Sequence, residues 1–245
     1  MKKINLEKKD KIYILIISLL LVVTIVLSVA VVIANQRKST WEMSDYYRNK
    51  VRSFAIQNTN LSQGQIVFVG DSITDLCPLD DYYSDLDLAC YNRGIGGDIT
   101  LGVIDRLQVS IFDLNPLKIV LMIGTNDVDF GYSYEKIVSN YRNLLEKIKE
   151  NQPTVDMYVM SVIPQNKDLE RSSGLDVTKN NKTIQKLNSD IKKMCEEFGY
   201  TFVDIYPELI DEDGYLRKDC SDDGLHLNAG GFEIWANTLK PYLME

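Results

Sequence analysis

Short apolar segments alternate with helical patterns along most of this chain, and the alternation restricts the folds that are open to it. The segments 66–69, 118–123 and 157–162 are rich in Val, Ile, Leu and Met, which is typical of buried strands. Helical spacing is clearest over 134–150, where the large apolar side chains fall on one face. Strands that alternate with helices of this length form a parallel sheet with helices on both faces. The predicted fold class is therefore α/β, and right-handed crossovers favour a flavodoxin-like strand order.

The remaining segments follow the same rhythm and divide the chain into four regions. Further strands are expected at 88–91 and 201–205, and further helices at 41–57, 100–111, 178–198 and 229–243. Ser39 and Thr40 are the expected caps of the first of these helices. The regions are a basic N-terminus over 1–11, an apolar segment over 12–34, a linker with a leading helix over 35–64, and an α/β domain over 65–245.

The segment 12–34 is a candidate membrane span. Its 23 residues carry no charge, and a helix that rises about 1.5 Å per residue would be roughly 34 Å long, enough to cross a bilayer core of about 30 Å. Five lysines precede it, whereas only Arg37 and Lys38 closely follow it, so the positive-inside rule predicts a cytoplasmic N-terminus and an extracellular α/β domain. The alternative is a cleaved signal peptide ending near Val32-Ile-Ala34, although a signal core is typically about 7–15 residues long.

Charge and cysteine content exclude some classes of function. The chain has a net charge of −8, and because residues 1–38 carry +5, a charge of −13 remains for 39–245. A domain this acidic is a poor candidate for binding nucleic acid. The four cysteines, at 77, 90, 195 and 220, have neither Cys-x-x-Cys spacing nor partner histidines, so no zinc site is expected. An extracellular domain permits disulfides, and both paired and free cysteines remain open.

Polar or glycine-rich segments follow three of the expected strands. Ser72 follows the first strand in Gly70-Asp-Ser-Ile-Thr74, Gly94 lies in the loop after the second, and Asn126 follows the third. Ligands of parallel sheets bind outside the carboxyl ends of the strands. The N–H groups of Ser72 and Gly94 and the side-chain amide of Asn126 could together form an oxyanion hole, whereas a simple turn is the alternative for Gly-Asp-Ser alone.

The single histidine of the chain supplies a candidate base for this serine. His226 lies in Asp222-Asp-Gly-Leu-His226, three residues after Asp223. On a loop, that spacing lets the carboxylate reach the imidazole, fix its tautomer and stabilise the imidazolium. The alternative is a structural histidine. Its position in a loop rich in glycine and aspartate, rather than on an apolar helix face, favours the catalytic interpretation.

Four short blocks in this order resemble the SGNH hydrolase family, also called the GDSL esterase/lipase family. They are Gly70-Asp-Ser-Ile73, Asn92-Arg-Gly-Ile-Gly-Gly97, Gly124-Thr-Asn-Asp127 and Asp223-Gly-Leu-His226. Each block is weak alone, but together they span nearly all of the α/β domain and end on the only histidine. Within the family the chain is similar to compact bacterial members, such as carbohydrate O-acetylesterases and platelet-activating-factor-acetylhydrolase-like enzymes.

The resemblance implies a three-layer α/β/α flavodoxin-like fold and a serine hydrolase that needs neither metal nor cofactor. It implies Ser72 as the nucleophile, His226 as general base and acid, and Asp223 as the residue that orients the imidazole. It also implies Ser72, Gly94 and Asn126 as the oxyanion-hole donors. Asp71 and Asp127 are expected to hold loops through hydrogen bonds to the backbone, with a chemical role as the alternative. Arg93 is expected to form a salt bridge, with a contact to substrate as the alternative.

The expected substrate depends on where the domain lies as well as on its fold. An anchored domain outside the cell would meet surface glycans, so the leading expectation is removal of small acyl groups, chiefly acetyl, from an extracellular or cell-wall polysaccharide. The first alternative is a lipase, lysophospholipase or thioesterase that acts on lipid acyl chains near the membrane. A non-catalytic binding protein on the same fold is the second. Tyr82, Tyr83, Tyr132 and Tyr134 could form a pocket for sugar or acyl groups or lie on surface loops, and the oligomeric state is open.

Overall fold

The computed structural model describes Tyr13, residues 16–25, Ser28, and residues 44–169 and 174–244. The chain divides into two units, Met1–Glu42 and Met43–Glu245. In the first unit the described residues are helical, but among the residues described no helix is both long and apolar enough to span a bilayer. Eleven of the 23 residues of the predicted span over 12–34, and both of its charged flanks, lie outside the described residues.

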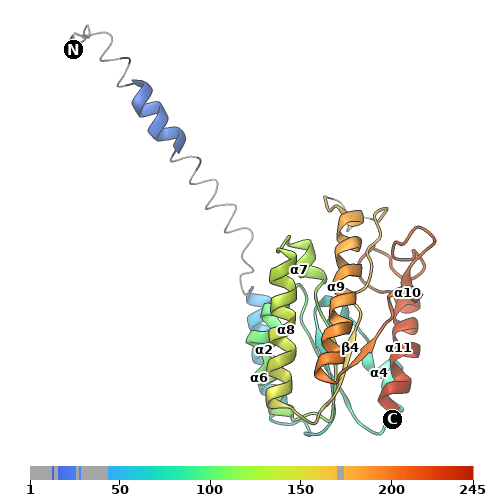
Figure 1. The fold of residues 1–245 in the computed structure, drawn as a ribbon. Helices are drawn as coiled ribbons and strands as arrows, with labels where there is room; N and C mark the ends of the chain where they lie inside the picture. Colours follow the sequence, from blue (N-terminus) through green and yellow to red (C-terminus); the bar gives the residue numbers. More distant parts are fainter. Residues whose placement is uncertain (1–12, 14–15, 26–27, 29–43, 170–173, 245) are drawn as a thin grey trace. The chain divides into compact units, whose positions relative to one another are not determined.

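The second unit is built on a five-stranded parallel sheet (Figure 1). Its strands are β1 (Ile66–Gly70), β2 (Cys90–Gly94), β3 (Lys118–Met122), β4 (Asp156–Met160) and β5 (Thr201–Val203). Their order in space is β2-β1-β3-β4-β5, and every neighbouring pair is parallel. This order is the flavodoxin-like one, so the predicted fold class and strand order are confirmed.

Helices connect these strands and cover the sheet. They are α2 (Asp45–Asn58), α3 (Ser72–Asp75), α4 (Leu79–Tyr83), α5 (Thr100–Asp105), α6 (Leu107–Ser110), α7 (Thr125–Asp129), α8 (Tyr134–Asn151), α9 (Val177–Phe198), α10 (Tyr206–Leu209) and α11 (Ala229–Met244). A short 3-10 helix covers Phe112–Leu114. The long helices α8 and α9 lie side by side (Figure 1).

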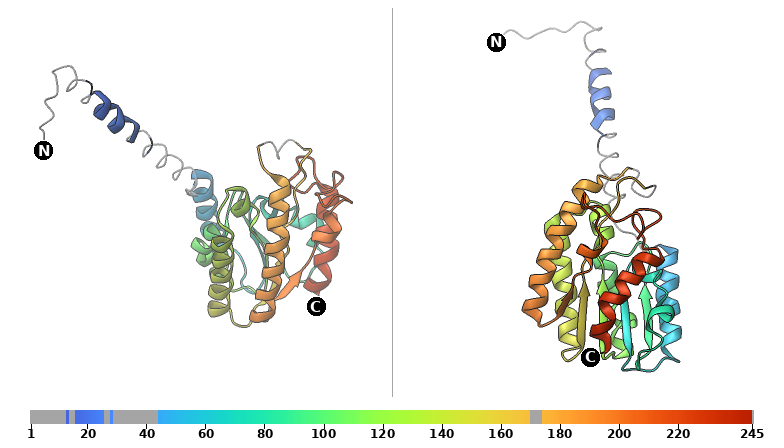
Figure 2. Two further views of the ribbon diagram at one scale, coloured as in Figure 1. Left: turned by 45° about the horizontal axis from the view of Figure 1, so that its top comes forward. Right: turned by 90° about the vertical axis from the view of Figure 1, so that its right-hand side faces the viewer.

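The sheet separates two apolar cores, which gives the three layers that the family resemblance implied. Along β1, Val67 and Val69 face a core formed with α5, α6, α8 and α9. Ile66 and Phe68 alternate with them and face a second core, formed with α4, α10 and α11. The helices of the two faces can be followed in Figure 2. All five residues of β1 and of β3 are buried, as expected of central strands covered on both faces.

Several predicted boundaries are wrong. The second strand was expected at 88–91, but β2 begins at Cys90 and continues to Gly94, because this polar segment pairs with β1 through Gly70. The leading helix has Ser44 as its cap, and the expected caps Ser39 and Thr40 lie outside the described residues. The helix expected over 100–111 is broken at Arg106, which leaves the helical conformation (φ −112°, ψ 13°).

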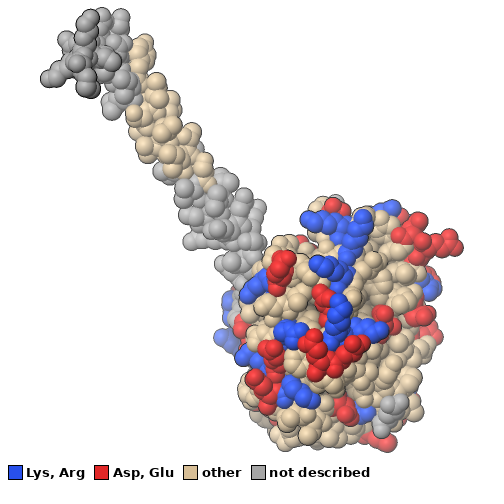
Figure 3. Space-filling view, in the orientation of Figure 1, with Lys and Arg blue, Asp and Glu red and all other residues tan. Residues whose placement is uncertain are grey.

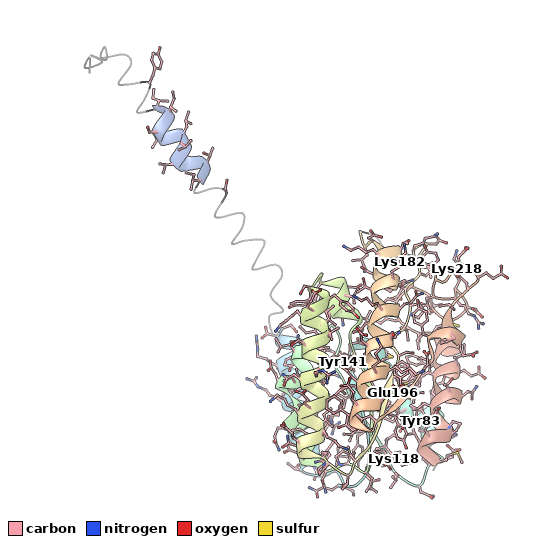
Figure 4. The ribbon with its side chains drawn as sticks, viewed as in Figure 1. Tyr83, Lys118, Tyr141, Lys182, Glu196 and Lys218 are labelled. Carbon is pink, nitrogen blue, oxygen red and sulfur yellow. The ribbon has the colours of Figure 1, made fainter. Side chains whose placement is uncertain are left out.

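The parallel arrangement brings the carboxyl ends of all five strands to one edge of the sheet. Lys118 begins β3 at the lower end of the view in Figure 4, whereas Lys182, in the second turn of α9, lies at the upper end. On the face that carries α8 and α9, Lys and Arg are interspersed with Asp and Glu (Figure 3). Ion pairs between Arg142 and Glu197 (2.8 Å) and between Lys193 and Asp190 (2.9 Å) contribute to this pattern.

Candidate active site

Ser72 lies where β1 passes into α3. Gly70 ends the strand, and a Cβ atom there would lie 2.3 Å from the carbonyl oxygen of Met122 and 2.2 Å from Thr74 Oγ1, so the close packing of this turn requires glycine. The side chain of Asp71 caps α3 by accepting a hydrogen bond from the N–H of Ile73 (3.0 Å). Ser72 is the first residue of α3, so its own N–H is not used within the helix.

Ser72, His226 and Asp223 form a continuous chain of hydrogen bonds. Ser72 Oγ lies 2.9 Å from His226 Nε2, although the two residues are 154 positions apart. His226 Nδ1 lies 2.6 Å from Asp223 Oδ2. The histidine side chain is 19% exposed and the aspartate side chain 36%, so these two residues are partly shielded from water and still reachable by a substrate.

Asp223 is held by several donors at once. Its Oδ1 accepts hydrogen bonds from the N–H groups of Leu225 (2.9 Å) and His226 (2.8 Å). Burial raises the pKa of Asp223, but the hydrogen bonds from the His226 side chain and from these two N–H groups outweigh it, and the net result is a lowered pKa. An ionised Asp223 favours the tautomer of His226 with a proton on Nδ1, which leaves Nε2 free to accept the Ser72 proton.

The loop after β4 braces the loop that carries Asp223 and His226. The N–H of Asn166 donates to the carbonyl of Gly224 (2.9 Å). Gly224 has a positive φ of 87°, and a Cβ there would lie 2.9 Å from the Asn166 carbonyl oxygen, so glycine is required at this close approach. Ser221 Oγ accepts from the Gly224 N–H (2.9 Å). The segment at Asn166 therefore supports the loop that carries Asp223 and His226.

Asn126 and Ser72 retain donors that could bind an oxyanion. One amide hydrogen of Asn126 donates to the carbonyl oxygen of Asp98 (2.8 Å), which fixes the buried side chain. The second amide hydrogen has no partner among the residues that the structure describes, and the same is true of the Ser72 N–H. Both groups are thus available to a substrate.

Gly94 does not fit the role expected of it. It lies in β2 rather than in a loop, and its N–H already donates to Asn92 Oδ1 (2.8 Å). The N–H of Gly96 donates to Asp75 Oδ2 (3.2 Å). Gly97 remains: within the described structure its N–H has no acceptor, and its φ is 77°. The sequence showed three glycines in this block, but only the end of β2 distinguishes them.

A buried polar network ties these segments together. Arg106 Nε pairs with Asp98 Oδ2 at 2.8 Å, and both side chains are almost fully buried. Asp127 accepts from the N–H and the hydroxyl of Thr100 (3.0 and 2.5 Å), so Asp127 and Asp71 hold backbone as predicted. Burial raises the pKa of Asp71 to about 7 and that of Asp127 to about 6.

Arg93 and three of the tyrosines singled out from the sequence contact other parts of the fold. Arg93 donates to the side-chain oxygens of Gln57 (3.2 Å) and Asn58 (2.9 Å), so the expected salt bridge is wrong in the described structure, where the α2 amides take the place of a carboxylate. Tyr83 is buried against Phe68. The Tyr82 hydroxyl donates to the Ala229 carbonyl and the Tyr134 hydroxyl donates to Asp190.

The described cysteines and acidic residues offer no metal centre. All four cysteines are free thiols, which answers the question of pairing that the sequence left open. Within the described ranges, His, Cys, Asp and Glu side chains form no group of three or more that could hold a metal ion.

Comparison with known proteins points to a hydrolase family. Residues 68–234 match the model of the GDSL-like lipase/acylhydrolase family. An N-acylneuraminate cytidylyltransferase of Streptococcus agalactiae serotype V is 27% identical over 179 residues, which cover 73% of this chain. The match covers only 38% of that relative, so the chain corresponds to less than half of its length.

Solved structures share the fold over most of their length. A Streptococcus pneumonia protein, provisionally described as a platelet activating factor, is 26% identical with a TM-score of 0.75, covering 81% of this chain and 92% of that one. A GDSL-like lipase from Bacteroides thetaiotaomicron is 24% identical with a TM-score of 0.69, covering 79% and 96%. An acetylxylan esterase from Geobacillus stearothermophilus is 19% identical with a TM-score of 0.56, covering 75% and 95%. The last two likenesses concern the fold alone.

Proposed function

We propose that this chain, which belongs to the GDSL-like lipase/acylhydrolase family and is a carboxylic ester hydrolase, removes small acyl groups from a carbohydrate. The acyl group is chiefly acetyl, and the reaction passes through an acyl-Ser72 intermediate. The observation that carries the proposal is the hydrogen-bonded chain from Ser72 through His226 to Asp223. A serine hydroxyl is a weak nucleophile unless a base accepts its proton during attack. Here His226 is the base, and Asp223 orients it.

The proposed first step is acylation of the serine. His226 Nε2, 2.9 Å from Ser72 Oγ, accepts the hydroxyl proton as the oxygen attacks the ester carbonyl carbon. Asp223 stabilises the imidazolium that forms. The negative charge on the carbonyl oxygen is bound by the Ser72 N–H, the free amide hydrogen of Asn126 and the Gly97 N–H, and each such donor is worth roughly 2.7–4 kcal/mol in barrier height.

Further proton transfers through His226 complete acylation and then remove the acyl group from Ser72. The imidazolium of His226 gives its proton to the leaving alcohol oxygen, and the C–O bond of the ester breaks to leave acyl-Ser72. Water then enters, loses a proton to His226, and attacks the acyl carbonyl carbon through a second oxyanion at the same donors. Collapse releases the carboxylic acid and returns the proton to Ser72 Oγ.

A carbohydrate substrate is supported by the curated relatives, which are named for an N-acylneuraminate, a sugar. The first solved relative is described in terms of a lipid mediator, so hydrolysis of lipid acyl esters is the second candidate. That candidate requires an apolar groove beside Ser72 that is long enough for an acyl chain.

We also propose that the domain acts outside the cell, held by residues 12–34 as a single-pass anchor. The support is the uncharged length of that segment and the lysines before it. Protease treatment of intact cells tests the arrangement. Digestion of the α/β domain from outside is the expected result, and a domain that is cut only after lysis would contradict it.

The test of substrate class compares acetylated glycans with lipids. We expect the purified full-length chain to release acetate from O-acetylated xylan or O-acetylated sialic acid, and to act more slowly on lysophospholipid. The Ser72→Ala variant should release nothing from either. Faster release of fatty acid than of acetate would favour the lipid candidate, and equal acetate release by wild type and variant would refute the proposed mechanism.

A further inference from the structure

Helix α2 brings an aromatic side chain to the edge of the site from outside the part that the family model matches. The hydroxyl of Tyr46, in the first turn of α2, donates to Asp75 Oδ2 at 2.5 Å. Asp75 is the last residue of α3, the helix that Ser72 begins. The Tyr46 side chain remains half exposed. Its neighbour Tyr47 is buried and donates to the Gly102 carbonyl (2.8 Å), which fixes α2 against α5.

The Asp75 carboxylate joins three segments at this point. It accepts from Tyr46 of α2, from Lys50 Nζ of α2 (2.6 Å), and from the N–H of Gly96 in the glycine block (3.2 Å). Burial and the adjacent Asp75 carboxylate raise the pKa of Tyr46 to about 12. The hydroxyl therefore stays protonated near neutral pH and keeps donating, so the position of the ring is fixed by a charge-assisted hydrogen bond.

Tyr46 and Ser72 both lie near the position that a side chain on Gly96 would occupy. A Cβ atom built on Gly96 would lie 3.5 Å from Tyr46 Cε1 and 3.9 Å from Ser72 Cβ. Both are ordinary van der Waals distances, so a carbon atom at that position would touch both side chains, and no more than one carbon atom fits between Tyr46 Cε1 and Ser72 Cβ. The absence of a side chain at Gly96 keeps that space open.

We propose that Tyr46 is a specificity-determining residue whose ring limits the acyl group on Ser72 to about the size of acetyl. The inference rests on the proposed esterase function and narrows its substrate. In the intermediate the acyl carbon is bonded to Ser72 Oγ, and the methyl group of an acetyl is small enough for the space between the serine and the ring. A longer acyl chain meets the ring of Tyr46, and a misfit of one methylene is worth about 10–200-fold in kcat/KM.

The test measures kcat/KM for p-nitrophenyl acetate, butyrate and octanoate with the full-length chain. In Tyr46→Ala we expect the ratio of butyrate to acetate to rise by at least about tenfold over wild type. Tyr46→Phe keeps the ring and loses only the hydrogen bond to Asp75, so its ratio of butyrate to acetate should stay well short of that change. Ile56→Ala, at an exposed position of the same helix, is the matched control and should leave kcat/KM unchanged for all three esters.

Each outcome bears on the inference. An unchanged chain-length ratio in an active Tyr46→Ala enzyme would overturn the inference and leave the esterase proposal intact. A Tyr46→Phe variant that shifts the ratio as far as Tyr46→Ala would also overturn it, because the hydrogen bond rather than the ring would then be responsible. A wild-type enzyme that cleaves no ester would refute both proposals. If Tyr46→Ala does not fold, Tyr46→Val removes the ring and shortens the side chain while keeping an apolar residue, with the same expected result.

Discussion

Arg106 donates a hydrogen bond to the main-chain carbonyl of Gly70, two residues before Ser72, at a distance of 3.0 Å. The same guanidinium donates to the carbonyl of Arg93 (2.7 Å) and to Asp98 Oδ2 (2.8 Å). It therefore joins the carboxyl ends of β1 and β2 to the loop that follows β2. The buried positive charge holds together the two segments that place the serine and the glycine block.

Removing Arg106 is expected to destabilise the domain strongly. Arg106→Ala leaves the carboxylate of Asp98 buried without its partner, and breaking such a buried pair costs about 3–5 kcal/mol. Urea denaturation followed by circular dichroism measures the free energy of unfolding. Arg48→Ala, which removes an exposed ion pair with Asp45, is the control and should change it by less than about 1 kcal/mol. Equal losses in the two variants would contradict the assigned role of Arg106.

Truncation of Asn126 should slow the chemical step more than it weakens binding. Its free amide hydrogen is assigned to the oxyanion, so Asn126→Ala is expected to lower kcat by about 10²–10³ with little change in KM. Asn151→Ala, at the exposed end of α8, is the control. Steady-state kinetics on p-nitrophenyl acetate distinguish the cases. A variant with unchanged kcat would remove Asn126 from the oxyanion hole.

Asp71 makes stability fall as the pH rises. Burial raises the pKa of Asp71 to about 7 in the folded protein, while an aspartate in the unfolded chain titrates near 3.9. Between these values the folded state binds more protons than the unfolded state, so the free energy of unfolding decreases with pH and levels off above about pH 7. The raised pKa of Asp127 acts in the same direction up to about pH 6.

The Asp71→Asn variant isolates this contribution. Between pH 5 and pH 8 its free energy of unfolding should decrease less than that of wild type, because the asparagine does not titrate. Urea midpoints at the two pH values are the measurement, and Asp113→Asn, at an exposed position, is the control. If Asp71→Asn showed the same pH dependence as wild type, the raised pKa of Asp71 would not be the cause.

The sequence predicted the architecture because its signals were local and repeated. Buried strands such as β3 are visible as apolar runs, and the rule of right-handed crossovers then leaves few strand orders. The meeting of Ser72 with Asp223 and His226 followed from the order of the four blocks, and the structure brings these side chains within hydrogen-bond distance.

Other features depend on tertiary contacts that leave no local signal. Gly94, Gly96 and Gly97 look alike in sequence, and only the pairing of β2 with β1 shows that the first of them lies within a strand. The break at Arg106 follows from its buried partners on β1 and β2, not from a helix-breaking residue. Tyr46 lies far from Ser72 in sequence, and its position depends on how α2 packs.

The most direct test of the account is whether Ser72 carries the acyl group. The wild-type chain, Ser72→Ala and the control Ser189→Ala, at an exposed serine of α9, would be mixed with p-nitrophenyl acetate, quenched in acid, digested and analysed by mass spectrometry. The account predicts acetyl on the peptide that contains Ser72 in the wild type and in Ser189→Ala, and none at position 72 together with lost turnover in Ser72→Ala. Undiminished turnover by Ser72→Ala, or acetyl found on a different residue of an active enzyme, would contradict it.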